Sequence, residues 1–271
     1  MNYHSDEWIM QRLREHYNEA LEHFPEDRIV CLILQGSQNY GLDVENSDID
    51  TKLIVTPTFE DIAMNKKPIS TTHIRENDEH IDFKDIRLYI QTFRKQNLNF
   101  LEILYSPYAI VNPLYKEQWN RLIEANEAIT HYNPFRAIKS MKGIAMEKWH
   151  AMEHRYPSKA EIIDKYGFDC KQLHHLLRVE EYIERYINGE SYADCLISKQ
   201  PEYLKAVKHH RYYTLDEARE LGQKSIDNIL DMHDKFVQQV SDEADPTVDK
   251  LLDDVQLEIM KIAVKQDIDK W

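Results

Sequence analysis

Residues 29–50 have the sequence IVCLILQGSQNYGLDVENSDID, which contains the clearest structural pattern of the chain. Its first six residues are apolar and rich in β-branched side chains, which indicates a strand buried on both faces. Gly36 allows a sharp turn after that strand, and Ser37 can cap a short helix that closes at Gly41. Amide groups exposed at such a turn attract phosphate, so the stretch predicts a strand followed by a phosphate-binding turn.

Two acids lead into the next apolar run, residues 53–55. Because side chains alternate along a strand, Asp48 and Asp50 are expected on one face and Ile49 on the other. A solvated turn is the alternative interpretation, since Asn46 and its neighbours are ordinary turn residues. The alternation into an apolar strand favours a pair of carboxylates that can share a divalent metal ion.

Two motifs carry a resemblance to a known family. Gly36, Ser37, Gly41 and residues 47–50 resemble the active-site signature of nucleotidyltransferases of the DNA polymerase β superfamily. Residues 166–178, YGFDCKQLHHLLR, are similar to a helical signature of its bacterial and phage branch, which includes RNA-repair-associated polymerase-β-like proteins. The resemblance implies an α+β fold: a small mixed sheet flanked by helices, followed by an all-helical C-terminal lobe.

The superfamily needs a third carboxylate on a neighbouring strand. Residues 71–75 and 80–83 have the pattern of a hairpin, with turn-forming residues 76–79 between them. Asp82 lies between apolar residues of this hairpin, and adjacent strands are about 4.8 Å apart, so Asp82 can share metals with the first two acids. Asp85 is the competing candidate, although its place at the start of an apparent helix is also explained by the helix dipole.

The resemblance also implies a mechanism. Asp48, Asp50 and Asp82 are expected to hold Mg²⁺, or Mn²⁺ in its place, while Gly36 and Ser37 hold the phosphates of ATP or another nucleoside triphosphate. The expected reaction moves a nucleoside monophosphate to an RNA 3′ end and releases pyrophosphate. Two alternatives stay open: transfer to a protein side chain, as in toxin–antitoxin or phage-defence settings, and a non-catalytic nucleotide-binding regulator.

The helix predicted after Asp169 has a cationic stripe. At 100° per residue, Lys171, His175, Arg178 and Tyr182 fall on one side and the apolar residues largely on the other. A solvated face is the simpler interpretation. The resemblance supports a second one, in which Lys171, His175 and Arg178 contact triphosphate or substrate backbone.

Two histidine pairs, His174–His175 and His209–His210, lack the spacing to further ligands that a zinc site requires, so packing or hydrogen bonding is expected of them. The three cysteines, Cys31, Cys170 and Cys195, are widely separated, which predicts reduced thiols rather than disulfides or a cysteine-based zinc site.

The remaining sequence sets the domain organisation. Residues 1–120 are predicted to form a nucleotidyltransferase catalytic domain and residues 121–271 a helical substrate- and nucleotide-binding domain. Helices are expected over residues 8–24, 134–156, 169–188, 215–240 and 247–268.

Bulk composition adds two expectations. No apolar run approaches the length of a membrane span and no signal peptide is apparent, so a soluble, cytoplasmic protein without membrane partners is expected. The formal net charge of −14 argues against non-specific binding of long nucleic acid, which depends on many lysine and arginine contacts to phosphate. A local basic groove remains compatible with that charge.

Overall fold

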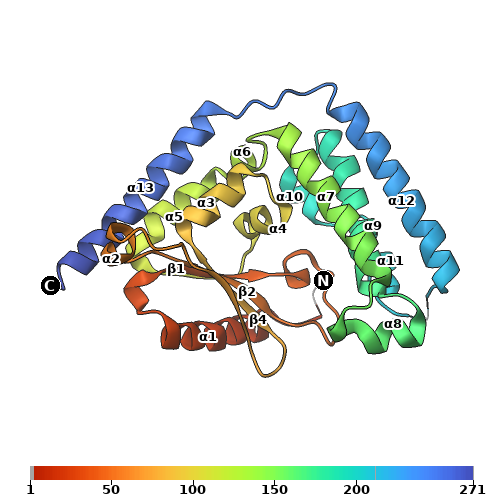
Figure 1. Ribbon diagram of the computed structural model, residues 1–271, viewed down its shortest axis with the longest axis horizontal. Coiled ribbons are helices and arrows are strands. Elements are labelled where there is room, and N and C mark those ends of the chain that lie inside the picture. The colour runs from red at the N-terminus through yellow and green to blue at the C-terminus, as the bar shows by residue number, and fades with distance from the viewer. Residues whose placement is uncertain (1–2, 211, 271) are drawn as a thin grey trace. The chain divides into compact units, whose positions relative to one another are not determined.

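The computed structural model describes residues 3–210 and 212–270. The chain forms two compact units, Met1–Tyr132 with Ala244–Trp271 (unit 1) and Asn133–Glu243 (unit 2). Figure 1 labels the elements of both units. Of the described helices, none is long and apolar enough to cross a membrane.

Unit 1 is built on a mixed five-stranded sheet with the order β3-β4-β2-β1-β5. Strands β1 and β2 are antiparallel, β2 and β4 are parallel, and β3 and β5 pair antiparallel at the two edges. The strands are β1 (Ile29–Gln35), β2 (Asp50–Val55), β3 (Ser70–Ile74), β4 (His80–Asp85) and β5 (Ala109–Val111). The mixed sheet and the β3–β4 hairpin confirm the predicted α+β class.

Helices cover both faces of this sheet. On one face, α1 (Asp6–His23) packs its apolar side, including Ile9 and Leu13, against Leu53 and Phe83. On the other face lies α3 (Ile86–Arg94), which follows β4 directly. The remaining helical segments of unit 1 are η1 (Glu26–Arg28), η2 (Ser37–Tyr40), α2 (Phe59–Ala63), α4 (Leu98–Leu101), η3 (Glu102–Tyr105), η4 (Pro113–Tyr115), α5 (Lys116–Glu124), α6 (Asn126–Thr130) and α13 (Pro246–Ile268).

The last helix, α13, packs with unit 1. It lies against α3 and α5, and Arg94 Nε donates to Asp249 Oδ1 over 2.7 Å while Arg121 pairs with Glu258 at 2.7 Å. The compact units therefore differ from the division predicted at residue 120, because an amphipathic pattern fixes which face a helix buries and not which partner covers that face.

Unit 2 is entirely helical over its described residues. Its elements are α7 (Pro134–Glu153), η5 (Pro157–Lys159), α8 (Ala160–Tyr166), α9 (Cys170–Ile187), α10 (Tyr192–Leu196), α11 (Pro201–Val207) and α12 (Leu215–Phe236). Helices α7, α9 and α12 pack on one another. At Gly222 of α12 the approach is so close that an added Cβ would stand 2.3 Å from the Trp149 ring of α7.

Candidate active site

The turn after β1 has the conformation that its glycines allow. Gly36 has φ 118° and Gly41 has φ 69°, both in the region that L side chains rarely adopt, and η2 lies between them. Ser37 is the first residue of η2 and Gly36 takes the N-cap position, so the structure does not bear out the possible capping role of Ser37. Gln38 Nε2 donates to the backbone oxygen of Asp48 over 2.8 Å, which ties the turn to the acidic segment.

The acidic segment alternates as its pattern predicts. The Ile49 side chain is fully buried in the core under α1, whereas Asp48 is exposed and the Asp50 side chain is 42% exposed. Strand β2 begins at Asp50, so Asp48 stands just before the ladder. The backbone N–H of His80 donates to Asp50 Oδ1 over 3.0 Å and holds this carboxylate at the start of β4.

Asp82 shares a face with Asp50. It lies opposite Lys52 in the parallel β2–β4 register, and Lys52 Nζ is 3.2 Å from Asp82 Oδ2. Since Lys52 is two residues after Asp50, the side chains of all three residues project from the same side of the sheet. Lys52 Nζ also lies 4.2 Å from the centroid of the Phe100 ring. Burial lowers the pKa of Lys52, and the charge of Asp82 acts against that shift.

Asp85 has a different role. Its side chain caps α3 by accepting from the backbone N–H of Arg87 over 2.8 Å, and its carboxylate also pairs with the Arg87 guanidinium at 2.7 Å. It lies opposite Val55 at the other end of β2, and it is 2% exposed. The capping geometry matches the helix-dipole interpretation of this acid.

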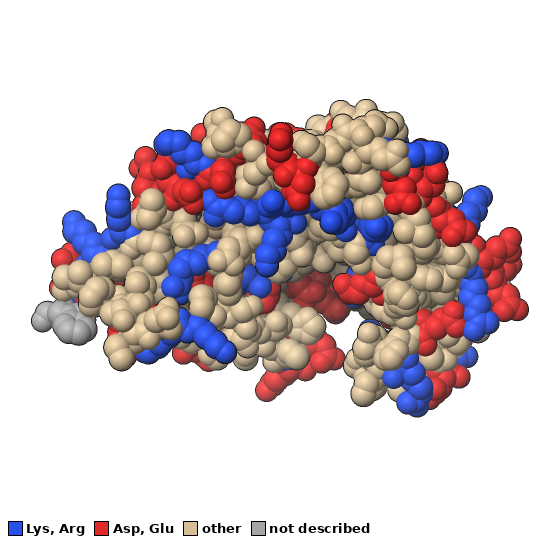
Figure 2. Space-filling model, turned by 45° about the horizontal axis from the view of Figure 1, so that its top comes forward, with Lys and Arg blue, Asp and Glu red and all other residues tan. Residues whose placement is uncertain are grey.

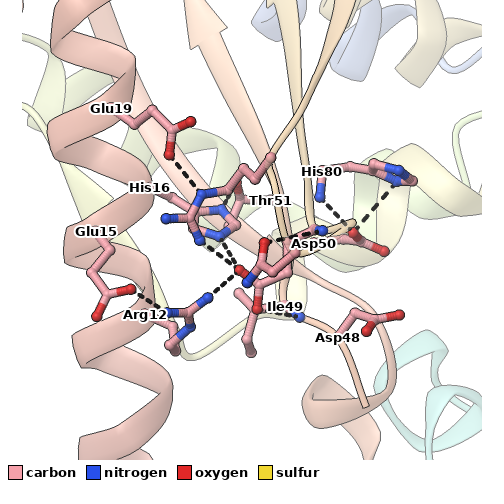
Figure 3. A network of polar contacts seen from close by, with 12 residues as sticks. Arg12, Glu15, His16, Glu19, Asp48, Ile49, Asp50, Thr51 and His80 are labelled. Carbon is pink, nitrogen blue, oxygen red and sulfur yellow. Dashed lines mark hydrogen bonds and ion pairs between the residues drawn. The ribbon is translucent and has the colours of Figure 1, made fainter. Parts of the chain in front are cut away.

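Glu79, at the tip of the β3–β4 hairpin, holds the backbone of the acidic segment through a hydrogen bond. Its Oε1 accepts from the backbone N–H of Ile49 over 3.3 Å, and its Oε2 accepts from Arg75 at 2.6 Å and from Arg12 of α1. His16 Nε2 lies 2.9 Å from the same Oε2. Figure 3 shows how Arg12 and His16 reach from α1 toward the segment of Ile49, while Asp48 points away from this network.

Glu79 is 5% exposed and carries its charge among these donors. Burial would raise its pKa, but the hydrogen bonds from His16, Asn77 and Arg12 outweigh burial and hold the pKa well below its usual range. A carboxylate only accepts hydrogen bonds, so His16 Nε2 donates to Glu79, and His16 Nδ1 lies 2.9 Å from the Thr51 hydroxyl.

Sequence reasoning placed Glu79 in a turn and missed this network. The one available signal is His16, a polar residue on the apolar face of the first helix, because a buried imidazole needs a partner.

A comparison with known families now decides the identity. The RNA repair pathway DNA polymerase beta family matches residues 7–180, which is more than half of the chain and includes the turn, the three acids and the start of α9. The chain belongs to this family. It is therefore a nucleotidyltransferase of the polymerase β type, as the two motifs predict. A comparison with curated proteins gave no match.

The family match extends over α1, whose side chains complete a pocket beside Asp48. A pocket of ≈ 510 Å³ is lined by Trp8, Arg12, Asp48, Asn77 and Glu79, among others. The ring of Trp8 stacks on His4 at a centroid distance of 4.0 Å. An exposed carboxylate and an aromatic platform thus border one hollow of unit 1.

The family match also covers Lys171, His175 and Arg178 of the cationic stripe of α9 in unit 2. Lys171 is exposed, His175 and Arg178 are partly buried, and Tyr182 is only 2% exposed, so the stripe runs from solvent into the core. Burial and the neighbouring His174 and Arg178 lower the pKa of His175 well below its usual value. The role of Lys171, His175 and Arg178 in binding nucleotide stays a prediction.

His174 fulfils the hydrogen-bonding role expected of it. Its Nδ1 lies 2.7 Å from the carbonyl oxygen of Leu204 in α11, and the side chain is 1% exposed. Burial lowers its pKa to about 3.

Proposed function

We propose that this nucleotidyltransferase moves a nucleoside monophosphate from a nucleoside triphosphate to the 3′ hydroxyl of an RNA, with release of pyrophosphate. The observation that supports it best is the β2–β4 register, which brings Asp50 and Asp82 to one face of two adjacent parallel strands. Asp48 precedes β2 directly, and Gln38 ties it to the turn of Gly36.

The three acids fit a hard divalent cation. They offer carboxylate oxygens only, which are the ligands that Mg²⁺ prefers, and Asp48 and Asp50 are open to solvent, so an ion can keep several waters. Divalent ions bound there would neutralise the triphosphate and favour deprotonation of the attacking hydroxyl. We assign Mg²⁺, with Mn²⁺ as a substitute, to Asp48, Asp50 and Asp82.

The residues around the proposed metal site have different roles in the reaction. Asp82 accepts a hydrogen bond from Lys52, which keeps its carboxylate oriented on the face of Asp50, where it can take the proton of the attacking hydroxyl. Gly36 lets the backbone approach the β- and γ-phosphates, and Ser37 contributes its hydroxyl and amide. Glu79 fixes the Ile49 amide and thereby the spacing between the acids before and after it.

We also propose that Lys171, His175 and Arg178 of α9 contact nucleotide phosphates. Arg178 is suited to bidentate phosphate contacts because a guanidinium presents parallel N–H groups. Lys171, near the start of α9, is exposed and free to reach a ligand.

The RNA acceptor rests on the family's description as an RNA repair pathway family. The surface limits how much RNA is held: the net charge is −14, and acidic and basic side chains are interspersed on the face shown in Figure 2. A protein that grips few phosphates suits a terminal hydroxyl better than a long duplex.

The test uses each of the four α-labelled nucleoside triphosphates with Mg²⁺ or Mn²⁺ and two RNAs, one ending in a 3′ hydroxyl and one blocked by a 3′ phosphate. Label is expected on the first RNA only. Asp48→Ala and Asp82→Asn should abolish the transfer, whereas Asp78→Asn, an exposed acid of the same hairpin tip, should retain it.

Two results would contradict the proposal. Label on protein in a cell lysate, with none on either RNA, would show that the acceptor is a protein side chain. Metal-dependent triphosphate binding without transfer to any acceptor would instead support a regulator.

A further inference from the structure

Three side chains that can ligate a metal ion converge in unit 2. Asp169, Cys170 and His210 each offer one ligand atom, and these atoms lie within 4.8 Å of one another. Asp169 and Cys170 begin α9, whereas His210 follows α11, so the cluster joins segments that are about 40 residues apart in the chain.

Only one of the two carboxylate oxygens of Asp169 has a hydrogen-bond partner among the described residues. Its Oδ1 caps α9 by accepting from the backbone N–H of Lys171 over 2.9 Å. Its Oδ2 is buried and has no hydrogen-bond partner among the described residues, although Asp169 is only 3% exposed. A buried, unpartnered carboxylate oxygen is costly, and a metal ion or an ordered water is what ordinarily relieves that cost.

His210 has a second unsatisfied atom in the same place. Its Nδ1 is buried and lacks a hydrogen-bond partner within the described part of the chain. The ring is held from two sides: Tyr166 stacks on it at 4.0 Å and Phe168 meets it edge-on at 5.5 Å. An imidazole fixed in this way can present a nitrogen without further loss of side-chain freedom.

We propose that Asp169, Cys170 and His210 bind a zinc ion that is separate from the Mg²⁺ of the catalytic acids. A thiolate, an imidazole and a carboxylate form the donor set that Zn²⁺ accepts and Mg²⁺ does not. The charges of Asp169 and the Cys170 thiolate balance the dication, so the buried site is neutral.

The geometry needs only a small adjustment. With zinc–ligand distances of about 2.0 to 2.3 Å, ligand atoms in a tetrahedral site stand roughly 3.5 Å apart, so the three atoms must close by about 1 Å. A pocket of ≈ 440 Å³, lined by Tyr166, Lys208, His209 and His210, adjoins the cluster and has room for a water as the fourth ligand.

Binding changes the state of Cys170. Without metal the thiol donates to the Lys208 carbonyl oxygen over 2.7 Å, and burial, followed by the charge of Asp169, raises its pKa to about 12. When Zn²⁺ binds, the thiol proton passes to solvent and the sulfur becomes a thiolate ligand, so one proton is released for each ion bound.

The ion would fix the start of α9. It would link the turn before this helix to the segment between α11 and α12, and Lys171 is the next residue along α9. The site combines one histidine, one cysteine and the cap residue of α9, a combination that the spacing of the histidines or of the cysteines alone does not indicate.

The test measures metal on the full-length protein. Purified protein stripped with a chelator is titrated with Co²⁺ and then Zn²⁺, and the thiolate-to-cobalt absorption and the zinc content are recorded. Wild type should bind one ion with a thiolate band that zinc removes. Cys170→Ser should lose the band, and His210→Ala should weaken binding by more than the about 10-fold to 100-fold caused by loss of a group that merely orients a ligand.

Cys195→Ser and His209→Ala are the matched controls, because Cys195 is another buried thiol of unit 2 and His209 is the exposed neighbour of His210. Both should bind zinc as wild type does. The proposal fails if wild type shows no thiolate band, or if Cys170→Ser and Cys195→Ser bind zinc equally. Circular dichroism of each variant separates loss of the site from loss of the fold.

Discussion

Replacing Glu79 by Gln tests how far its buried charge stabilises the segment that carries the proposed catalytic acids. The change keeps the size of the side chain but removes a charge that Arg12, Arg75 and His16 surround. Removing one partner of a buried ion pair costs about 3 to 5 kcal/mol. Arg12 keeps Glu15 and Arg75 keeps Glu19, so neither guanidinium is left unpaired, and we expect the variant to lose about 2 to 3 kcal/mol.

The assay is urea unfolding of the full chain at pH 7, followed by hydrogen exchange of peptides from β1 and β2 so that unit 1 is observed separately. With an m-value of about 2 kcal/mol per molar urea, the midpoint of unit 1 should fall by about 1 to 1.5 M. Glu15→Gln is the control, because it removes a more exposed partner of the same Arg12 and should cost less than about 1 kcal/mol.

The pH dependence gives a second readout. The folded-state pKa of Glu79 is lowered, so its stabilisation is complete above the unfolded-state pKa of about 4.3 and is lost as the pH falls below that value. The difference between wild type and Glu79→Gln should therefore shrink below about pH 4.3. Equal midpoints of Glu79→Gln and Glu15→Gln at pH 7 would contradict the stabilising role of the buried Glu79 charge.

Three further predictions follow from other residues. Lys52→Met removes an ammonium group 3.2 Å from Asp82, so Mn²⁺ should bind the three acids about 10-fold more tightly. Titration with Mn²⁺ followed by electron paramagnetic resonance measures this affinity, and equal affinity of wild type and variant would show that Lys52 does not compete with the metal ion. Gly36→Ala forces an L side chain to adopt φ 118°, which should lower the free energy of unfolding by about 1 to 3 kcal/mol and raise KM for the nucleotide. Gly143→Ala in α7 is the control: no described atom lies within 4 Å of its added Cβ, so its free energy of unfolding in urea should be unchanged or higher. Burial lowers the pKa of His174 to about 3, so below about pH 6.5 this residue alone should cost unit 2 about 1.4 kcal/mol per pH unit, in addition to the loss from His175, whose pKa is also lowered. The slope of a His174→Gln variant should be shallower by about that amount, and an unchanged slope would contradict this.

Apolar runs, strand alternation and helical periodicity predicted most of the long helices and the central strands. The apolar run of β1, the alternation around Ile49 and the 3.6-residue periods of α7, α9, α12 and α13 each reappear in the structure. The three-residue strand β5 was not predicted, because it is too short to show a period.

The features that the sequence did not predict depend on contacts between residues far apart in the chain. Glu79 contacts residues 63 and 67 positions earlier, and nothing near it in the sequence signals those partners. Tyr182 projects onto the polar stripe of its helix and is nevertheless buried, because neighbouring aromatic rings such as Tyr192 cover that end of the stripe. The choice between Asp82 and Asp85 likewise depends on strand register, which the hairpin pattern does not contain.

The return of α13 to unit 1 makes unit 2 an insertion. The two ends of the insertion meet: the N–H of Asp245 donates to the Tyr132 carbonyl over 2.9 Å, and the Asn133 amide donates to Asp242 over 2.8 Å. During translation, the sheet of unit 1 leaves the ribosome early, whereas the helix that covers α3 and α5 emerges only after all of unit 2. Unit 1 therefore completes its core last, and a nascent chain halted after residue 243 would expose the apolar surface that α13 covers.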